Sequence, residues 1–148
     1  MTVLIFRTMK VIVVEGLTEY TVLDTLFPAL AGKKVKLYVA QGFSNVFASA
    51  KSFIDFGFDV LAVLDTDTNI PGNDNRDIMK RIQTSGLAGR PINIVWMDAC
   101  IEDVLRRANL NMFQKNNRGI ILKQAVNKNK DAILALDEFR KIEEFIEG

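Results

Sequence analysis

Residues 10–16 read KVIVVEG, a run of mostly β-branched side chains that ends at an acidic residue and a glycine. A second apolar run, VLAVL at residues 60–64, also leads directly into acidic residues. Uninterrupted apolar strands are typical of parallel sheets, because helices cover both faces of such a sheet. We therefore expect two buried strands, at residues 10–14 and 60–64, each followed by a carboxylate.

The chain between and after these segments alternates in the same way. Residues 35–40 and 92–97 are further apolar segments with the composition of strands. Apolar side chains recur with helical spacing over residues 18–30, 44–56 and 75–87. Strand–helix alternation with short connections predicts right-handed βαβ units. The expected fold is α/β, with a Rossmann-like, open, mainly parallel four-stranded sheet flanked by helices.

Beyond residue 97 the pattern becomes helical. We expect helices over residues 101–108, 120–127 and 132–147, with a turn at residues 116–119. The last helix carries an apolar stripe that predicts a core-facing side, formed by Ile133, Leu136, Phe139, Ile142 and Phe145 or Ile146. At the other end of the chain, residues 2–6 are strand-like and are expected to add an edge strand.

Length and composition predict one domain over residues 1–148, with a core at about 9–108 and a helical extension at 109–148. Hydrophobic residues make up 49% of the chain, which excludes a disordered protein. The single cysteine, Cys100, cannot form an internal disulfide, which is typical of a reducing compartment such as the cytoplasm. No apolar run approaches the roughly 18 residues of a membrane span, and no signal peptide is recognisable, so no membrane association is expected.

The chain contains no histidine. This excludes zinc sites with histidine ligands, Ser-His-Asp and Cys-His catalysis, and imidazole acid/base chemistry. The remaining groups for catalysis are carboxylates, lysine, arginine, hydroxyl groups and a hard metal ion.

The net charge of +1 conceals an uneven distribution. Residues 104–130 carry seven basic side chains and no acidic one, whereas the last 18 residues are mainly acidic. The basic side chains are Arg106, Arg107, Lys115, Arg118, Lys123, Lys128 and Lys130. This basic stretch either lines a phosphate-binding face or is a solvated surface.

Carboxylates follow the two central apolar runs. Glu15 comes directly after the first, and Asp65 and Asp67 after the second, so the two aspartates point to the same side of the strand tip. Ligands of open α/β sheets bind at the carboxyl ends of the strands. Carboxylates held together there repel each other unless a cation is present, and oxygen-only ligands suit Mg²⁺ or Mn²⁺. Acidic residues at strand ends can also simply cap helices, so this pattern alone leaves both interpretations open.

Four motifs occur in a specific order: VEGLTE at residues 14–19, GFSNV at 42–46, DTD at 65–67 and IED at 101–103. Together they resemble the Toprim domain, and most closely the Toprim part of the overcoming-lysogenisation-defect (OLD) nucleases. The resemblance covers about residues 9–108.

This resemblance implies a set of metal-binding residues. Asp65 and Asp67 would bind a divalent metal, and Glu15 would be either a ligand or the general acid/base. Glu19, one helical turn after Glu15, would face the same centre. Glu102 would supply a further ligand, to a second ion in a two-metal arrangement, or would be only a first-turn acid favoured by the helix dipole.

It also implies residues that bind the nucleic acid. Gly16 would let the backbone approach the ligand. Gly42 and Ser44 would hold a phosphate at a strand-to-helix turn, although Ser44, like Thr18, could be only a helix N-cap. Lys123, with Arg118 as the alternative, would offset charge in the transition state. Arg106 and Arg107 would contribute to the basic face.

The expected function is a Mg²⁺- or Mn²⁺-dependent endonuclease acting on DNA or RNA, in phage, defence or DNA-repair processes. OLD proteins usually carry an ATPase domain, and this chain lacks a G-x-x-x-x-G-K-[ST] motif. The resemblance therefore implies either a stand-alone nuclease or the metal-binding subunit of an assembly with an ATPase or other protein partner. One alternative is a non-catalytic module of a larger complex that binds metal and nucleic acid, or only a partner protein. Another is a haloacid-dehalogenase-like phosphatase, because Asp65-Thr66-Asp67 also fits that family's nucleophile motif.

Overall fold

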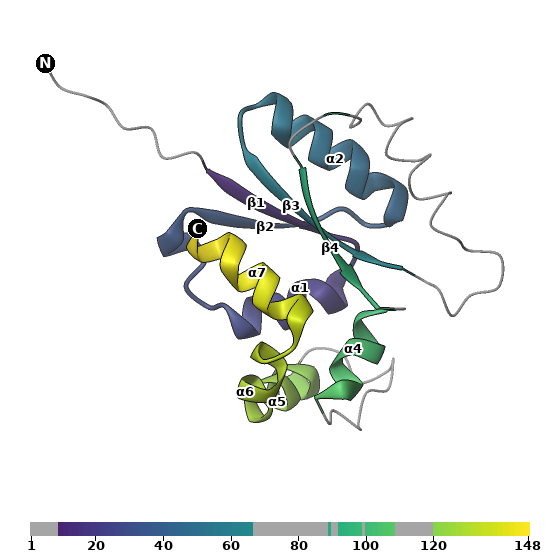
Figure 1. Ribbon diagram of the computed structural model, residues 1–148, viewed down its shortest axis with the longest axis vertical. Helices are drawn as coiled ribbons and strands as arrows, with labels where there is room; N and C mark the ends of the chain where they lie inside the picture. Colours follow the sequence, from purple (N-terminus) through teal and green to yellow (C-terminus); the bar gives the residue numbers. More distant parts are fainter. Residues whose placement is uncertain (1–8, 67–88, 90–91, 99, 109–119) are drawn as a thin grey trace, which may run out of the picture.

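The structure is a computed structural model that describes residues 9–66, 89, 92–98, 100–108 and 120–148. Its sheet is four-stranded and parallel throughout, in the order β2-β1-β3-β4 (Figure 1). The strands are β1 (Lys10–Val14), β2 (Val35–Val39), β3 (Asp59–Asp65) and β4 (Ile92–Met97). The predicted open α/β fold with a mainly parallel four-stranded sheet is confirmed.

Helices cover both faces of this sheet (Figure 1). They are α1 (Leu17–Leu26), the short 3-10 helix η1 (Ala31–Lys33), α2 (Phe43–Asp55), α4 (Ile101–Arg107), α5 (Ile120–Lys128), α6 (Lys130–Leu134) and α7 (Asp137–Glu147). The strand predicted at residues 2–6, the helix at 75–87 and the turn at 116–119 lie outside the described residues. Among the helices that the structure describes, none has both the length and the apolar character needed to cross a membrane.

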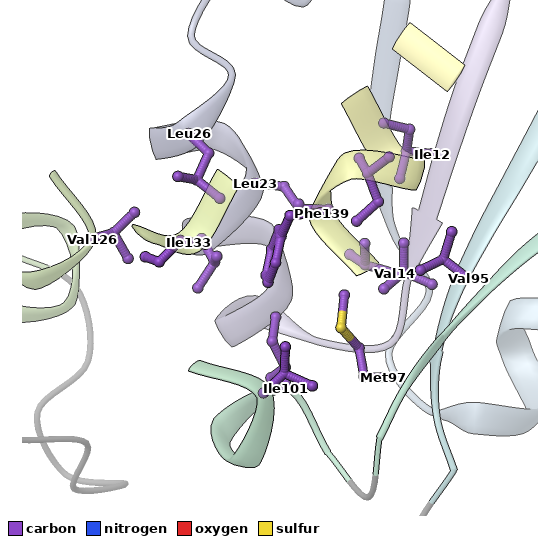
Figure 2. Packing of buried hydrophobic residues seen from close by; sticks show 14 of the residues in the cluster. Ile12, Val14, Leu23, Leu26, Val95, Met97, Ile101, Val126, Ile133 and Phe139 are labelled. Carbon is purple, nitrogen blue, oxygen red and sulfur yellow. The ribbon is translucent and has the colours of Figure 1, made fainter. Parts of the chain in front are cut away.

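Each central strand is buried on both of its faces. In β1, Val11 and Val13 pack with α2 on one side of the sheet, whereas Ile12 and Val14 pack with the other helices on the opposite side. Figure 2 shows Ile12 and Val14 on the face of the sheet that α7 covers, in the same cluster as Phe139. This two-sided burial explains why the KVIVV run shows no alternation with polar residues.

Helix α1 ends at Leu26, four residues earlier than the predicted end at residue 30. The next residue, Phe27, has φ −124° and ψ 71° and precedes Pro28. A proline excludes the preceding residue from the helical region, because its ring clashes with that residue's backbone. The apolar spacing continued past this point, but the proline ends the helix.

The single C-terminal helix predicted over residues 132–147 is wrong in one respect, because two helices, α6 and α7, cover this region. The chain is extended at Leu136, with φ −73° and ψ 142°, and α7 begins with two acidic residues, Asp137 and Glu138. Acidic side chains stabilise a helix N-terminus, so this position favours a new start. The predicted stripe is nevertheless confirmed, since Phe139 and Ile142 are fully buried and Ile146 is the buried member at its end.

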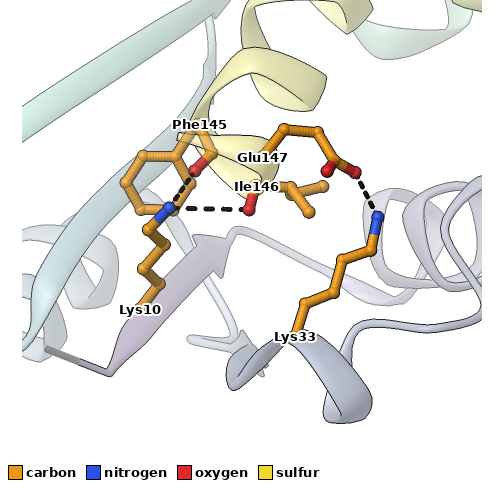
Figure 3. A network of polar contacts seen from close by, with 5 residues as sticks. All are labelled: Lys10, Lys33, Phe145, Ile146 and Glu147. Atoms are coloured by element: carbon orange, nitrogen blue, oxygen red, sulfur yellow. Dashed lines mark hydrogen bonds and ion pairs between the residues drawn. The ribbon is translucent and has the colours of Figure 1, made fainter. Parts of the chain in front are cut away.

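The C-terminal end of α7 is anchored at the amino edge of the sheet (Figure 3). Lys10, the first residue of β1, donates from Nζ to the carbonyl oxygen of Phe145 at 2.7 Å and also reaches that of Ile146. Lys33 forms an ion pair with Glu147. A polar hollow of about 630 Å³ adjoins these contacts. Two of its lining residues, Lys10 and Lys33, therefore have a structural role in capping and pairing with α7.

Candidate metal centre

The strand order makes the carboxyl ends of β1 and β3 the topological switch point of the sheet. The chain passes from β1 outward to β2 through α1, and then returns across β1 to β3 through α2 on the opposite face. The two connections therefore diverge between β1 and β3. In doubly wound sheets this point is where ligands bind. Glu15 directly follows β1 and Asp65 is the last residue of β3, so both lie at the switch point.

Three carboxylates meet at this point. Glu15, Glu19 and Asp65 each offer one oxygen, and these three oxygens all lie within 4.8 Å of one another. Glu19 projects from the first turn of α1 and is only 7% exposed, whereas Glu15 and Asp65 are half-buried. The structure thus brings together three of the predicted metal-binding residues. Asp67, the third of the carboxylates predicted to follow the strands, lies outside the described residues.

Glu15 is held on both its side chain and its backbone. Its Oε2 accepts a hydrogen bond from the backbone amide of Asp65 at 3.2 Å. Its carbonyl oxygen accepts one from the amide of Gly42 at 3.0 Å. Glu15 therefore connects the ends of three neighbouring strands, which restricts the directions in which its carboxylate can point.

Asp65 is oriented by the helix that follows β4. The backbone amide of Ile101, the first residue of α4, donates to Oδ1 of Asp65 at 3.1 Å. Beside it, the amide of Thr66 donates to the carbonyl oxygen of Met97, which keeps the tip of β3 against β4. Neither contact is visible in the sequence, because each joins residues more than 30 positions apart.

The cluster has the chemistry of a cation site. Three ionised carboxylates whose oxygens lie within 4.8 Å repel one another. The repulsion costs about 1 kcal/mol per pair even in bulk water, and it costs more where the groups are partly buried. A bound cation would turn this repulsion into attraction, and carboxylate oxygens are ligands for hard divalent ions. Glu15, Glu19 and Asp65 could therefore hold a metal ion.

Gly16 and Gly42, the glycines near the centre, differ in backbone conformation. Gly16 is extended, with φ −151°, which any residue can adopt, so it is not required for a special turn. A Cβ atom there would lie 3.4 Å from Oε2 of Glu19, and glycine instead leaves room beside that carboxylate. Gly42 has φ 120°, a conformation that favours glycine strongly. Its amide is bound to Glu15, so this donor is already used within the protein.

Neither predicted hydroxyl cap is present. Helix α1 begins at Leu17 and has Gly16 as its N-cap, because the carbonyl oxygen of Gly16 already accepts the amide of Tyr20. Thr18 therefore lies inside the first turn, where it is buried. Helix α2 likewise has Gly42 as its N-cap, and Ser44 is an exposed residue of the first turn.

Glu102 and Cys100 lie next to the centre at the start of α4. Glu102 is half-buried and follows the residue whose amide binds Asp65, but it is not a member of the cluster described above. Cys100 is the N-cap residue of α4. Burial and the carboxylate of Glu102 raise the pKa of the Cys100 thiol to about 12, so this thiol stays protonated at neutral pH.

Four basic side chains of this stretch are exposed among the described residues, namely Arg106, Arg107, Lys123 and Lys128, and two of them form ion pairs. Arg106 contacts Asp103 on its own helix, and Arg107 contacts Glu138 at the start of α7. Lys123 is exposed on α5, a helix that packs against α1. Arg118 lies outside the described residues.

No family model, curated protein or solved structure matches this chain in comparisons with known proteins. The acidic cluster and its place in the sheet are therefore the features that bear on function.

Proposed function

We propose that this protein is a Mg²⁺- or Mn²⁺-dependent nuclease that cleaves phosphodiester bonds in DNA or RNA. The observation that carries this proposal is the cluster of Glu15, Glu19 and Asp65, whose oxygens lie within 4.8 Å at the switch point of a parallel sheet. The order of the acidic and glycine motifs, which resembles that of Toprim domains, supports the same assignment.

The donor set favours a hard, oxygen-preferring ion. All three clustered groups are carboxylates, the chain has no histidine, and the Cys100 thiol is protonated at neutral pH. Zinc and copper sites usually include nitrogen or sulfur ligands, whereas carboxylates and water suit Mg²⁺ and Mn²⁺. Asp67 and Glu102 are the residues that we propose for additional ligands or a second ion.

Phosphodiester hydrolysis would use the ion, Glu15 and a basic side chain. When bound, the ion would stabilise charge on the phosphoryl oxygens and lower the pKa of a water molecule. Glu15 would serve as a ligand or as the general acid/base, and its hydrogen bond from Asp65 directs one of its oxygens. Lys123 or Arg118 would offset negative charge in the transition state. The basic stretch would bind the nucleic-acid backbone, together with the first turn of α2 around Ser44.

A biological role in phage, defence or repair processes follows from the resemblance to OLD nucleases, and so does an ATPase or other protein as a partner. These parts of the proposal rest on the motifs VEGLTE, GFSNV, DTD and IED alone.

The decisive experiment compares two substitutions on the same strand. Asp65→Asn should abolish cleavage of plasmid DNA, single-stranded DNA or RNA with Mg²⁺ or Mn²⁺, because it removes a charged ligand while keeping the side-chain shape. Asp59→Asn is the matched control, since Asp59 is an exposed aspartate at the opposite end of β3. Cleavage that survives Asp65→Asn, or that survives chelation, would overturn the mechanism.

The same assays separate the alternatives. Rapid hydrolysis of a chromogenic phosphate monoester without nucleic-acid cleavage would favour the phosphatase, in which Asp65 is the nucleophile. Binding of Mn²⁺ and nucleic acid without cleavage of either substrate would favour the non-catalytic module.

A further inference from the structure

We propose that the ion pair between Arg107 and Glu138 positions the metal ligand Asp65 through helix α4. This inference rests on the proposed metal site and assigns Arg107 and Glu138 as positioning residues for it. Arg107 would then act mainly within the protein and not as a contact to nucleic acid, which was its predicted role.

Helix α4 contacts the acidic cluster through its first turn. The amide of Ile101 donates to Oδ1 of Asp65, and this amide is part of the first turn of α4. Any displacement of α4 therefore displaces a donor that holds one carboxylate oxygen of Asp65. Groups that hydrogen-bond a ligand in this way fix its orientation toward the metal.

Helix α4 is held by packing in the core and by an ion pair with α7. Its inner side consists of Ile101, Val104 and Leu105, all fully buried in the larger core. Its C-terminal end is attached to α7 by Arg107, whose guanidinium lies 2.5 Å from Oε1 of Glu138. This contact joins α4 and α7 across 31 positions of the chain, so no local pattern in the sequence indicates it.

The carboxylate of Glu138 is largely buried. Its side chain is 15% exposed, and its other oxygen, Oε2, is buried without a hydrogen-bond partner among the described residues. A carboxylate in this environment is costly unless a cation compensates it, and removal of the cation leaves an unpaired buried charge. Loss of Arg107 should therefore disturb the start of α7 and the end of α4 together.

The neighbouring Arg106 provides an internal comparison. It pairs with Asp103, three residues before it on the same helix, and its side chain is 59% exposed. Removing Arg106 deletes the same charge from the same helix but, among the described residues, breaks no ion pair between helices. The two arginines therefore separate an effect of charge from an effect of position.

Electrostatics predicts effects of opposite sign for the two substitutions, whereas positioning predicts effects of the same sign. By charge alone, Arg107→Ala should strengthen binding of a cation, and Glu138→Gln should weaken it. If the pair positions Asp65, both substitutions should weaken binding. The agreement in sign between the two variants is therefore the signature of positioning.

The experiment measures Mn²⁺ affinity by isothermal titration calorimetry, at a temperature where circular dichroism shows that every variant is folded. Arg107→Ala and Glu138→Gln should each weaken Mn²⁺ binding about ten-fold, the lower end of the effect of groups that orient metal ligands. Arg106→Ala should leave affinity unchanged or slightly higher. The double variant should lose no more than either single variant, because the two residues act as one unit.

A second readout does not depend on metal. The exchange rate of the Ile101 amide hydrogen, measured by NMR without metal, should increase in both pair variants and stay unchanged in Arg106→Ala. Unchanged exchange and unchanged affinity in a protein that binds Mn²⁺ would overturn this inference alone. A wild-type protein that binds no Mn²⁺ would overturn the proposed metal site and, with it, the role of the pair in metal binding.

Discussion

The backbone amide of Asp65 donates a hydrogen bond to Oε2 of Glu15 at 3.2 Å, across 50 positions of the chain. The pairing of β1 with β3 brings these residues together, since Val14 lies opposite Val63 in the ladder. The acidic cluster is therefore a product of strand register. A shift of one residue in this register would place the side chain of Asp65 on the other face of the sheet, away from Glu15 and Glu19.

Glu19→Gln should stabilise the metal-free protein. Glu19 is buried beside two other carboxylates, and the amide keeps the shape of the side chain while removing like-charge repulsion. We expect a gain of about 1 kcal/mol, or roughly 3 °C in the melting temperature. Thermal unfolding in the presence of a chelator measures this gain.

Added Mn²⁺ should make the wild-type protein more stable than Glu19→Gln. The wild-type protein should gain about 2.7 kcal/mol at 100 times its dissociation constant, and Glu19→Gln should gain less at that concentration. Glu144→Gln on the exposed side of α7 serves as the control and should change neither measurement. A metal-free Glu19→Gln protein that is less stable than wild type would show that the carboxylate has a structural role.

Gly42→Ala should destabilise the turn between β2 and α2. Gly42 has φ 120°, and an L-residue there is strained whatever space surrounds it. We expect a loss of about 1–2 kcal/mol in the free energy of unfolding, measured in urea. Gly32→Ala is the matched control, because a Cβ atom at Gly32 would meet nothing within 4 Å. Equal stabilities of the two variants would contradict the turn geometry.

Lys10→Met should loosen the C-terminal end of α7. The ammonium group binds the carbonyl oxygen of Phe145 and lies 5.4 Å from the centre of its ring, so methionine keeps the stem and removes these contacts. We expect a loss of about 1–2 kcal/mol in the free energy of unfolding. Lys51→Met removes only an exposed pair with Asp55 and should cost less than about 0.5 kcal/mol. A similar cost for both would mean that Lys10 does not anchor the helix.

The basic stretch makes a separate prediction about salt dependence. If Lys123 and Arg118 contact phosphates, alanine at either position should weaken binding of duplex DNA. It should also reduce the slope of log affinity against log salt by about 0.9. Lys51→Ala, outside this stretch, should change neither quantity. Fluorescence anisotropy at several salt concentrations measures both, and an unchanged slope would identify the stretch as solvated surface.

The elements of the sheet were predictable because their signals are local. Apolar runs marked all four strands, and β1 and β4 have the predicted limits. The errors occurred where the period of the side chains continued through a change of backbone. Pro28 ends α1 within its apolar stripe, and the extended residue Leu136 divides a stripe that a single helix could also have formed. Hydrophobic spacing records which face is buried, and it does not record breaks that preserve that face.

By itself, the sequence determined the α/β class, the strands and the carboxylates that follow them, because these depend on side-chain type and on spacing over a few residues. Only the tertiary structure decided that the carboxylates of Glu15, Glu19 and Asp65 lie together and that the amide of Ile101 orients Asp65. It also decided that Arg107 pairs with Glu138. These contacts join residues that are distant in the chain, and they depend on strand order, register and helix packing, which no local pattern of residues encodes.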